Sequence, residues 1–275
     1  MKVLTLILLA GTAFAQESAD AIMARVAANQ DRAQAARESM VYEQDVLIRL
    51  QRANRKLARE ESYQFVVTPT RDGVTKERKS FAGKYEAKGV EHTYGQPGFE
   101  YKDLDIDGEV AHELVDDLTN DKSRDGIARD LFPLRAAEVE KYRFTLKGRE
   151  RYRGREVYAV RFEPRKASME DDSRIWAGEA LIDAAEYQPV LITTWMAHGL
   201  PLAVKTLLGT DLKHMGFKLA YEKFDNDVWM PVSYGGELYL RAVFFYKRHI
   251  SISLRNSGFR RANVESTVSY TLPPE

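Results

Sequence analysis

The sequence predicts an α+β protein whose main element is a curved antiparallel sheet with a few helices packed on it. Apolar and polar residues alternate in many short runs; Phe217, Leu219 and Tyr221, for example, alternate with Lys218 and Ala220, which is the period of a half-buried strand. Short turn-forming segments separate these runs, so neighbouring strands most simply pair as an antiparallel meander. Helical spacing of apolar residues occurs in few segments, the first of them near the N-terminus.

The first fifteen residues have the pattern of an export signal. Lys2 supplies a positive start, residues 3–10 an apolar core, and the Ala-Phe-Ala sequence at 13–15 a cleavage site of the small-x-small type. The apolar run is too short to span a bilayer. We therefore expect cleavage after Ala15 and a single soluble domain over residues 16–275, with the periplasm as its compartment. Because the chain has no cysteine, we expect neither disulfides nor a lipid anchor.

The first half of the mature chain is predicted to begin with a helix over residues 18–39. Ser18 or Asp20 can cap it, and Ile22, Met23 and Val26 follow at the spacing of one helical face. Strands are predicted over residues 41–50, 57–67 and 74–85, an irregular section over 89–98, and two short helices within 109–131.

The second half is predicted to consist mainly of strands. A hairpin turns at Arg153-Gly154, and the pair Gly235-Gly236 is expected to make a second turn. The predicted strands cover residues 142–146, 156–162, 176–183, 187–196, 217–224, 228–234, 237–246 and 249–254, with a last edge strand over 258–270. An apolar segment over 200–208, flanked by glycines, is either a core helix or a mobile cover over a cavity.

Charge and motifs exclude several classes of function. Lysine plus arginine equals aspartate plus glutamate, at 41 each, which argues against nucleic acid as a partner. His112-Glu113 resembles the start of a zinc motif, but Asp116 stands where the second histidine belongs. The alternating aspartates at 103–107 resemble a calcium loop, but Leu114 occupies the position of its bidentate glutamate. We expect no metal, no cofactor and no catalytic residue.

Three segments carry a resemblance to a known family. They are the run Trp176-Ala-Gly-Glu-Ala-Leu-Ile-Asp183 with Tyr187-Gln-Pro-Val190, the opening helix at 22–29, and Asp227-Val-Trp-Met-Pro231. In these segments the chain resembles the outer-membrane-lipoprotein-sorting proteins, the LolA/LolB-like periplasmic carriers. The resemblance implies an incomplete, half-open antiparallel β-barrel covered by helices, which holds acyl chains in an apolar interior. Residues around 89–130 have no counterpart in it.

The predicted function is therefore a soluble periplasmic carrier of acyl chains, from lipids or lipoproteins, for sorting to the outer membrane. We expect a monomer that makes transient membrane contact and has a possible protein partner in the envelope. The alternatives are a non-catalytic envelope sensor with the same fold, and a hydrolase of envelope polymers. The expected lipid-binding side chains come from alternating strand positions and the apolar segment: Leu181, Ile192, Trp195, Leu202, Leu207, Phe217, Leu219, Leu240 and Phe244.

Overall fold

A computed structural model describes most of the expected mature domain. It covers residues 17–70, 73–118, 134–165, 176–197, 211–225, 228–242 and 245–262. The export signal expected at residues 1–15 and the apolar segment over 200–208 lie outside these ranges. Among the helices of the described ranges, none has both the length and the hydropathy to cross a bilayer.

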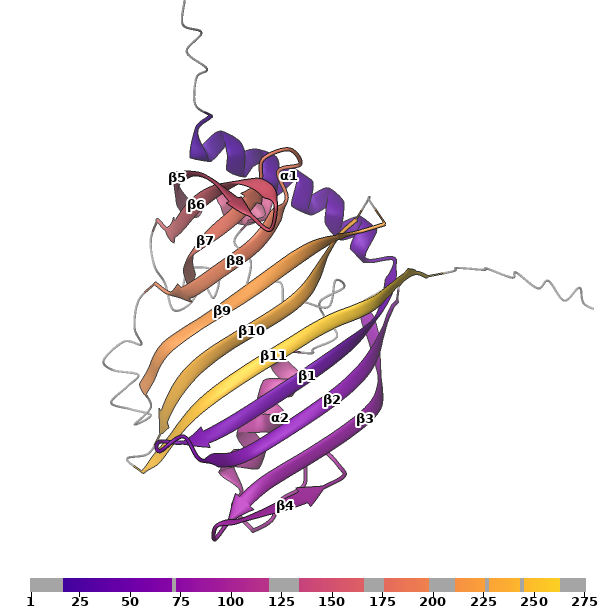
Figure 1. The fold of residues 1–275 in the computed structure, drawn as a ribbon, viewed down its shortest axis with the longest axis vertical. Coiled ribbons are helices and arrows are strands. Elements are labelled where there is room, and N and C mark those ends of the chain that lie inside the picture. The colour runs from indigo at the N-terminus through magenta and orange to yellow at the C-terminus, as the bar shows by residue number, and fades with distance from the viewer. Residues whose placement is uncertain are drawn as a thin grey trace, which may run out of the picture.

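The described strands form one antiparallel sheet of 11 strands in the order β4-β3-β2-β1-β11-β10-β9-β8-β7-β6-β5. The sheet is open, with β4 and β5 as its edges, and the predicted fold class is confirmed (Figure 1). The strands are β1 (Met40–Arg52), β2 (Leu57–Pro69), β3 (Val74–Ala87), β4 (Val90–Tyr94), β5 (Tyr142–Tyr152), β6 (Arg155–Pro164), β7 (Trp176–Asp183), β8 (Pro189–Met196), β9 (Asp211–Phe224), β10 (Val228–Ala242) and β11 (Tyr246–Arg261).

Two meanders make up the sheet, and the first and last strands join them. Strands β1 to β4 form one meander and β5 to β11 the other, and β1 pairs with β11 along nearly its whole length, from Met40 opposite Arg261 to Arg52 opposite Arg248. Each neighbouring strand within a meander is also the next in the chain, as expected for hairpin connections.

Within the described ranges, three helices accompany the sheet: α1 (Ala19–Arg37), α2 (Ile106–Leu118) and α3 (Ala136–Val139). Helix α1 begins where predicted, because the Ser18 Oγ accepts a hydrogen bond from the Ala21 N–H at 3.2 Å. Helix α1 contacts β10, β5 and α3, whereas α2 contacts β1 and β2. In Figure 1, α1 crosses the upper end of the sheet and α2 lies behind β11, β1 and β2.

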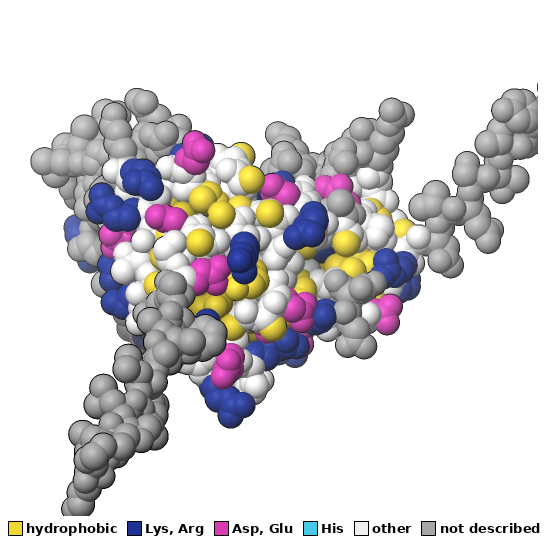
Figure 2. Space-filling model, turned by 90° about the horizontal axis from the view of Figure 1, so that it is seen from above, with side chains coloured by type: hydrophobic (Ala, Val, Ile, Leu, Met, Phe, Trp, Pro, Cys, Tyr) yellow, Lys and Arg dark blue, Asp and Glu magenta, His cyan; other side chains and the backbone are white. Residues whose placement is uncertain are grey.

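The hydrophobic core lies between the sheet and these helices. Ile22 and Met23 of α1 and Ala111 of α2 belong to one buried cluster with Ile48 and Leu219 of the sheet. The face of the sheet that carries this cluster is termed the inner face, and the opposite one the open face. Seen from the α1 end, side chains of both charges are interspersed with apolar ones (Figure 2), in keeping with a net charge of zero.

Four sequence predictions differ from the structure. Gly235 and Gly236 make no turn, because residues 228–242 form the single strand β10. Residues 258–261 continue β11, a central strand rather than an edge, and residues 263–270 lie outside the described ranges. Part of the section 89–98, predicted to be irregular, pairs with β3 as strand β4. Of the helical region 109–131, the part up to residue 118 belongs to α2, which begins at Ile106, and residues 119–133 are not described.

Candidate functional site

Four of the predicted lipid-binding residues lie on the inner face. Ile192 pairs with Leu219 across β8 and β9, and Phe217 of β9 pairs with Gly236 of β10. Ile192, Leu219 and Phe217 are buried, with exposed fractions of 1%, 2% and 8%. Leu240, further along β10, is half-buried and packs against the same core.

Leu181 and Trp195 lie on the open face, so the predicted lining does not form a single surface. Leu181 pairs with Leu191, one residue before Ile192, and Trp195 lies three residues after Ile192 and pairs with Gly216, so both are an odd number of positions from Ile192. Because side chains alternate along a strand, a one-residue offset moves them to the opposite face. Trp195 instead stacks under the Arg161 guanidinium, whose carbon is 5.6 Å from the ring centroid. Leu202, Leu207 and Phe244 lie outside the described residues.

A buried strip of apolar side chains, termed the apolar strip, crosses the middle of the inner face. It consists of Ile192 on β8, Phe217 and Leu219 on β9, Tyr234 on β10 and Ile252 on β11. The rings of Phe217 and Tyr234 stack at 5.3 Å between centroids, which fixes both side chains.

Tyr234 is the one member of the apolar strip with a polar atom in its side chain. The residue is 6% exposed, and its hydroxyl has no hydrogen-bond partner within the described part of the chain. Burial raises the pKa of this hydroxyl well above its ordinary value, so it remains a neutral hydrogen-bond donor. Buried hydroxyls are normally paired, and this one therefore requires an explanation.

A buried ionic cluster lies between α2 and the inner face of the sheet. Arg59, at 0% exposure, donates to Glu61 at 2.7 Å and to Asp105 at 2.6 Å. The hydroxyls of Tyr63 and Tyr94 both donate to the Glu61 carboxylate. Every charged group in the cluster thus has an opposite charge or a hydrogen-bond donor beside it, which buried ions require.

The aspartates that resembled a calcium loop serve the N-terminus of α2 instead. Asp105 accepts a hydrogen bond from the Gly108 N–H at 3.2 Å, as a helix cap does. Asp107 accepts two hydrogen bonds from Arg248, at 2.7 and 2.8 Å, and a third from the Tyr246 hydroxyl at 2.8 Å. Arginines thus balance both carboxylates. Over the described residues, no group of three or more His, Asp or Glu side chains is arranged to hold a metal ion.

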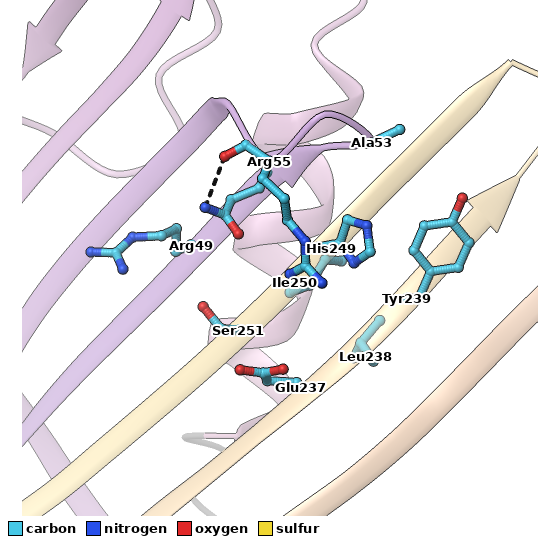
Figure 3. Close-up of a pocket in the computed structure, with 10 residues that line it drawn as sticks. Arg49, Ala53, Arg55, Glu237, Leu238, Tyr239, His249, Ile250 and Ser251 are labelled. Carbon is cyan, nitrogen blue, oxygen red and sulfur yellow. Dashed lines mark hydrogen bonds between the residues drawn. The ribbon is translucent and has the colours of Figure 1, made fainter.

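The open face carries two adjoining hollows. The first, of about 730 Å³, extends over β1, β11 and β10 (Figure 3) and is lined by Arg49, Gln51, Ala53, Arg55, Glu237, Leu238, Tyr239, His249, Ile250 and Ser251. The second, of about 700 Å³, continues toward β8 and shares Glu237 and Ser251 with the first. No sequence motif marks the polar residues of these hollows, because they lie at single strand positions and in the turn between β1 and β2.

Comparisons with known proteins give distant structural neighbours only. No family model and no curated protein sequence matches the chain. Among solved structures, a DUF1329 family protein from Desulfovibrio piger has a TM-score of 0.39 and 11% identity, over 91% of this chain and 96% of its own.

Two further neighbours carry the name of the family that the sequence resembles. An outer-membrane lipoprotein-sorting protein domain from Vibrio parahaemolyticus has a TM-score of 0.36 and 12% identity, over 86% of this chain and 93% of its own. A LolA superfamily protein from Nitrosomonas europaea has a TM-score of 0.34 and 10% identity, over 91% and 96%. The neighbours thus include the family named from the sequence, but the similarity is too low to assign a function.

Proposed function

We propose that the protein is a non-catalytic carrier that binds the acyl chains of lipids or lipidated proteins on the apolar strip of its inner face. The observation that carries the proposal is the buried, unpartnered hydroxyl of Tyr234 within this strip. A site for an acylated ligand needs a large apolar surface and a few polar groups that orient the ligand. The carbonyl oxygen of an acyl ester or amide is an acceptor that such a hydroxyl can satisfy.

The energetics favour binding without any covalent step. Each methylene transferred from water to an apolar surface contributes about 0.8 kcal/mol, so a long acyl chain supplies the greater part of the binding free energy. An unpaired buried hydroxyl costs about 1–3 kcal/mol, which a carbonyl acceptor on the ligand would recover.

Entry of the ligand requires displacement of what covers the apolar strip, since its side chains are buried in the absence of ligand. Helices α1 and α2 contact different parts of the sheet, β10 with β5 and β1 with β2 respectively. In the proposed mechanism α1, which contacts the strip strand β10, moves away from the sheet and the acyl chain takes its place. The proposed compartment is the periplasm, because residues 1–15 have the composition of an export signal.

Uptake of a fluorescent fatty acid, with mass spectrometry of lipids that co-purify from a bacterial periplasm, tests the proposal. Leu219→Ala removes apolar surface from the strip and should weaken uptake about tenfold. Leu191→Ala is the matched control, because Leu191 lies next to the strip residue Ile192 in β8 but on the open face. Circular dichroism verifies that both variants are folded. Absence of co-purifying lipid together with no uptake by the unmodified protein would overturn the proposal.

A further inference from the structure

The first hollow of the open face contains two side chains of opposite charge that have no partner. Arg55 lies in the turn between β1 and β2, and Glu237 lies on β10; both are exposed. Within the described residues, neither the Arg55 guanidinium nor the Glu237 carboxylate forms a hydrogen bond or an ion pair. Arg49, the other arginine of the hollow, is by contrast paired with Glu60. Among the described residues, the hollow therefore offers a ligand one unpaired positive charge, at Arg55, and one unpaired negative charge, at Glu237.

His249 lines the same hollow as these two charges. Figure 3 shows the Arg55 side chain reaching from its turn over β11 to the imidazole, with Glu237 on the neighbouring strand. Partial burial and the positive charge of Arg55 lower the pKa of His249, whereas Glu237 acts in the opposite direction. Both charges are thus within electrostatic reach of one ring. The ring of Tyr239, 4.7 Å from that of His249 between centroids, forms the far wall.

This arrangement is complementary to a ligand that is itself doubly charged. A guanidinium offers a planar pair of N–H donors that fits a phosphate or carboxylate, and a carboxylate accepts hydrogen bonds from a primary ammonium group. The neutral imidazole of His249 beside them adds no charge that would repel the ammonium group. An anion alone would bring one negative charge next to Glu237, and a cation alone one positive charge next to Arg55.

The size of the hollow indicates a group attached to a larger molecule. Its volume of about 730 Å³ exceeds that of a small zwitterion, and the second hollow continues it past Ser251. Hydroxyl side chains of Thr193, Ser233 and Ser253 line that continuation. A phosphodiester linked to an ammonium group combines the two charges with a point of attachment to a larger polar molecule.

We propose that the first hollow of the open face binds a zwitterion of the phosphoethanolamine type, with its phosphate at Arg55 and its ammonium group at Glu237. This site lies on the face opposite to the apolar strip, and it does not depend on acyl-chain binding. The zwitterion can belong to a lipid headgroup in a bilayer or to a soluble molecule, and the two sources share this chemistry.

Titration of the full chain with O-phosphoethanolamine, followed by NMR shifts of His249, tests the site. Binding should be about tenfold tighter than that of inorganic phosphate or ethanolamine alone. Arg55→Asn removes the cation and suits the left-handed backbone of this turn, where φ is 66°. It should weaken binding about tenfold, as should Glu237→Gln. Arg255→Gln is the control, because Arg255 is an exposed cation of β11 that does not line either hollow.

A second arm identifies the source of the zwitterion. Vesicles of phosphatidylcholine with and without phosphatidylethanolamine are compared in a flotation assay. Retention that depends on phosphatidylethanolamine and on Arg55 supports a lipid headgroup, whereas binding of the soluble compound alone supports a soluble ligand. The proposal is overturned if phosphate alone binds as tightly as phosphoethanolamine, if Arg255→Gln weakens binding as much as Arg55→Asn, or if neither probe binds.

Discussion

Single residues of the inner face show how closely an aromatic side chain can pack over a strand. Gly83, Gly178 and Gly236 each lie beneath a ring, those of Tyr94, Phe162 and Phe217 respectively; a Cβ atom at any of these glycines would come within 2.4 Å of a ring carbon. The absence of a side chain is thus what allows the ring to lie on the backbone. This packing explains why Gly236, part of a Gly-Gly pair that is typical of a turn, occurs inside a strand.

Replacement of Gly178 by alanine should destabilise the protein by about 1–3 kcal/mol, the usual effect of overpacking. The new Cβ atom would be 2.2 Å from the Phe162 ring and 2.4 Å from the carbonyl oxygen of Thr193. The free energy of unfolding in urea measures the effect. Gly95→Ala is the control, since a Cβ atom there meets nothing within 4 Å. Equal stability of the two variants would contradict this packing.

Tyr234→Phe tests the unpartnered hydroxyl in two ways, through the stability of the protein and through its binding of an acyl ester. Removal of a hydroxyl that has no partner should leave the free energy of unfolding of the ligand-free protein unchanged or raise it by about 1 kcal/mol. The same variant should bind an acyl ester less tightly than the unmodified protein does. An ether-linked analogue lacks the carbonyl and should bind to the variant and to the unmodified protein with equal affinity. Urea unfolding and fluorescence titration give the two readouts. A clear loss of stability would mean that the hydroxyl has a structural partner.

At the scale of elements, the buried ionic cluster ties α2 to the sheet. The Arg59 guanidinium joins β2 to Asp105 at the start of the helix, and Arg248 of β11 pairs with Asp107, two residues further along the chain. In both pairs a cation of a strand meets an acidic residue at a helix N-terminus, where the helix dipole also favours negative charge. The position of α2 over β1 and β2 is therefore determined by ion pairs in addition to apolar packing.

Glu61→Gln should destabilise the protein by about 3–5 kcal/mol, because it removes one of the two anions beside a fully buried guanidinium. Glu77→Gln is the control: its ion pair with Lys79 is exposed, and such a pair contributes at most about 1 kcal/mol. The free energies of unfolding of the two variants are compared in urea at neutral pH. A similar small effect for both would show that Asp105 alone balances Arg59.

Much of the arrangement of elements could be predicted from the sequence, because local patterns determine it. Ser18 and the apolar spacing after it located α1, and a run of strand-forming residues located β7 with its observed bounds. Strand β4 escaped prediction because its side chains are mostly exposed and offer no alternation. Leu181 and Trp195 were grouped with Ile192 although they lie on the opposite face, since a one-residue offset reverses every side chain of a strand. The ionic cluster joins residues 46 positions apart, and spacing along the chain gives no signal for such a contact.

At the scale of the whole molecule, the pairing of β1 with β11 makes one surface out of two meanders. It aligns Ile48 with Ile252 and so continues the apolar strip into the first meander. The same pairing places Gln51 beside His249 and brings the turn that carries Arg55 to the first hollow. One strand pair thus contributes to both proposed sites, which lie on opposite faces of the sheet.

The measurement that tests the central proposal most directly is photo-crosslinking with a fatty acid that carries a diazirine near the end of its chain. Peptide mass spectrometry then locates the labelled residues. Binding on the inner face predicts labels at residues of the apolar strip such as Phe217, Tyr234 and Ile252, and their loss when unlabelled fatty acid competes. Labels confined to open-face residues such as Leu191 and Trp195, or labels that resist competition, would contradict it.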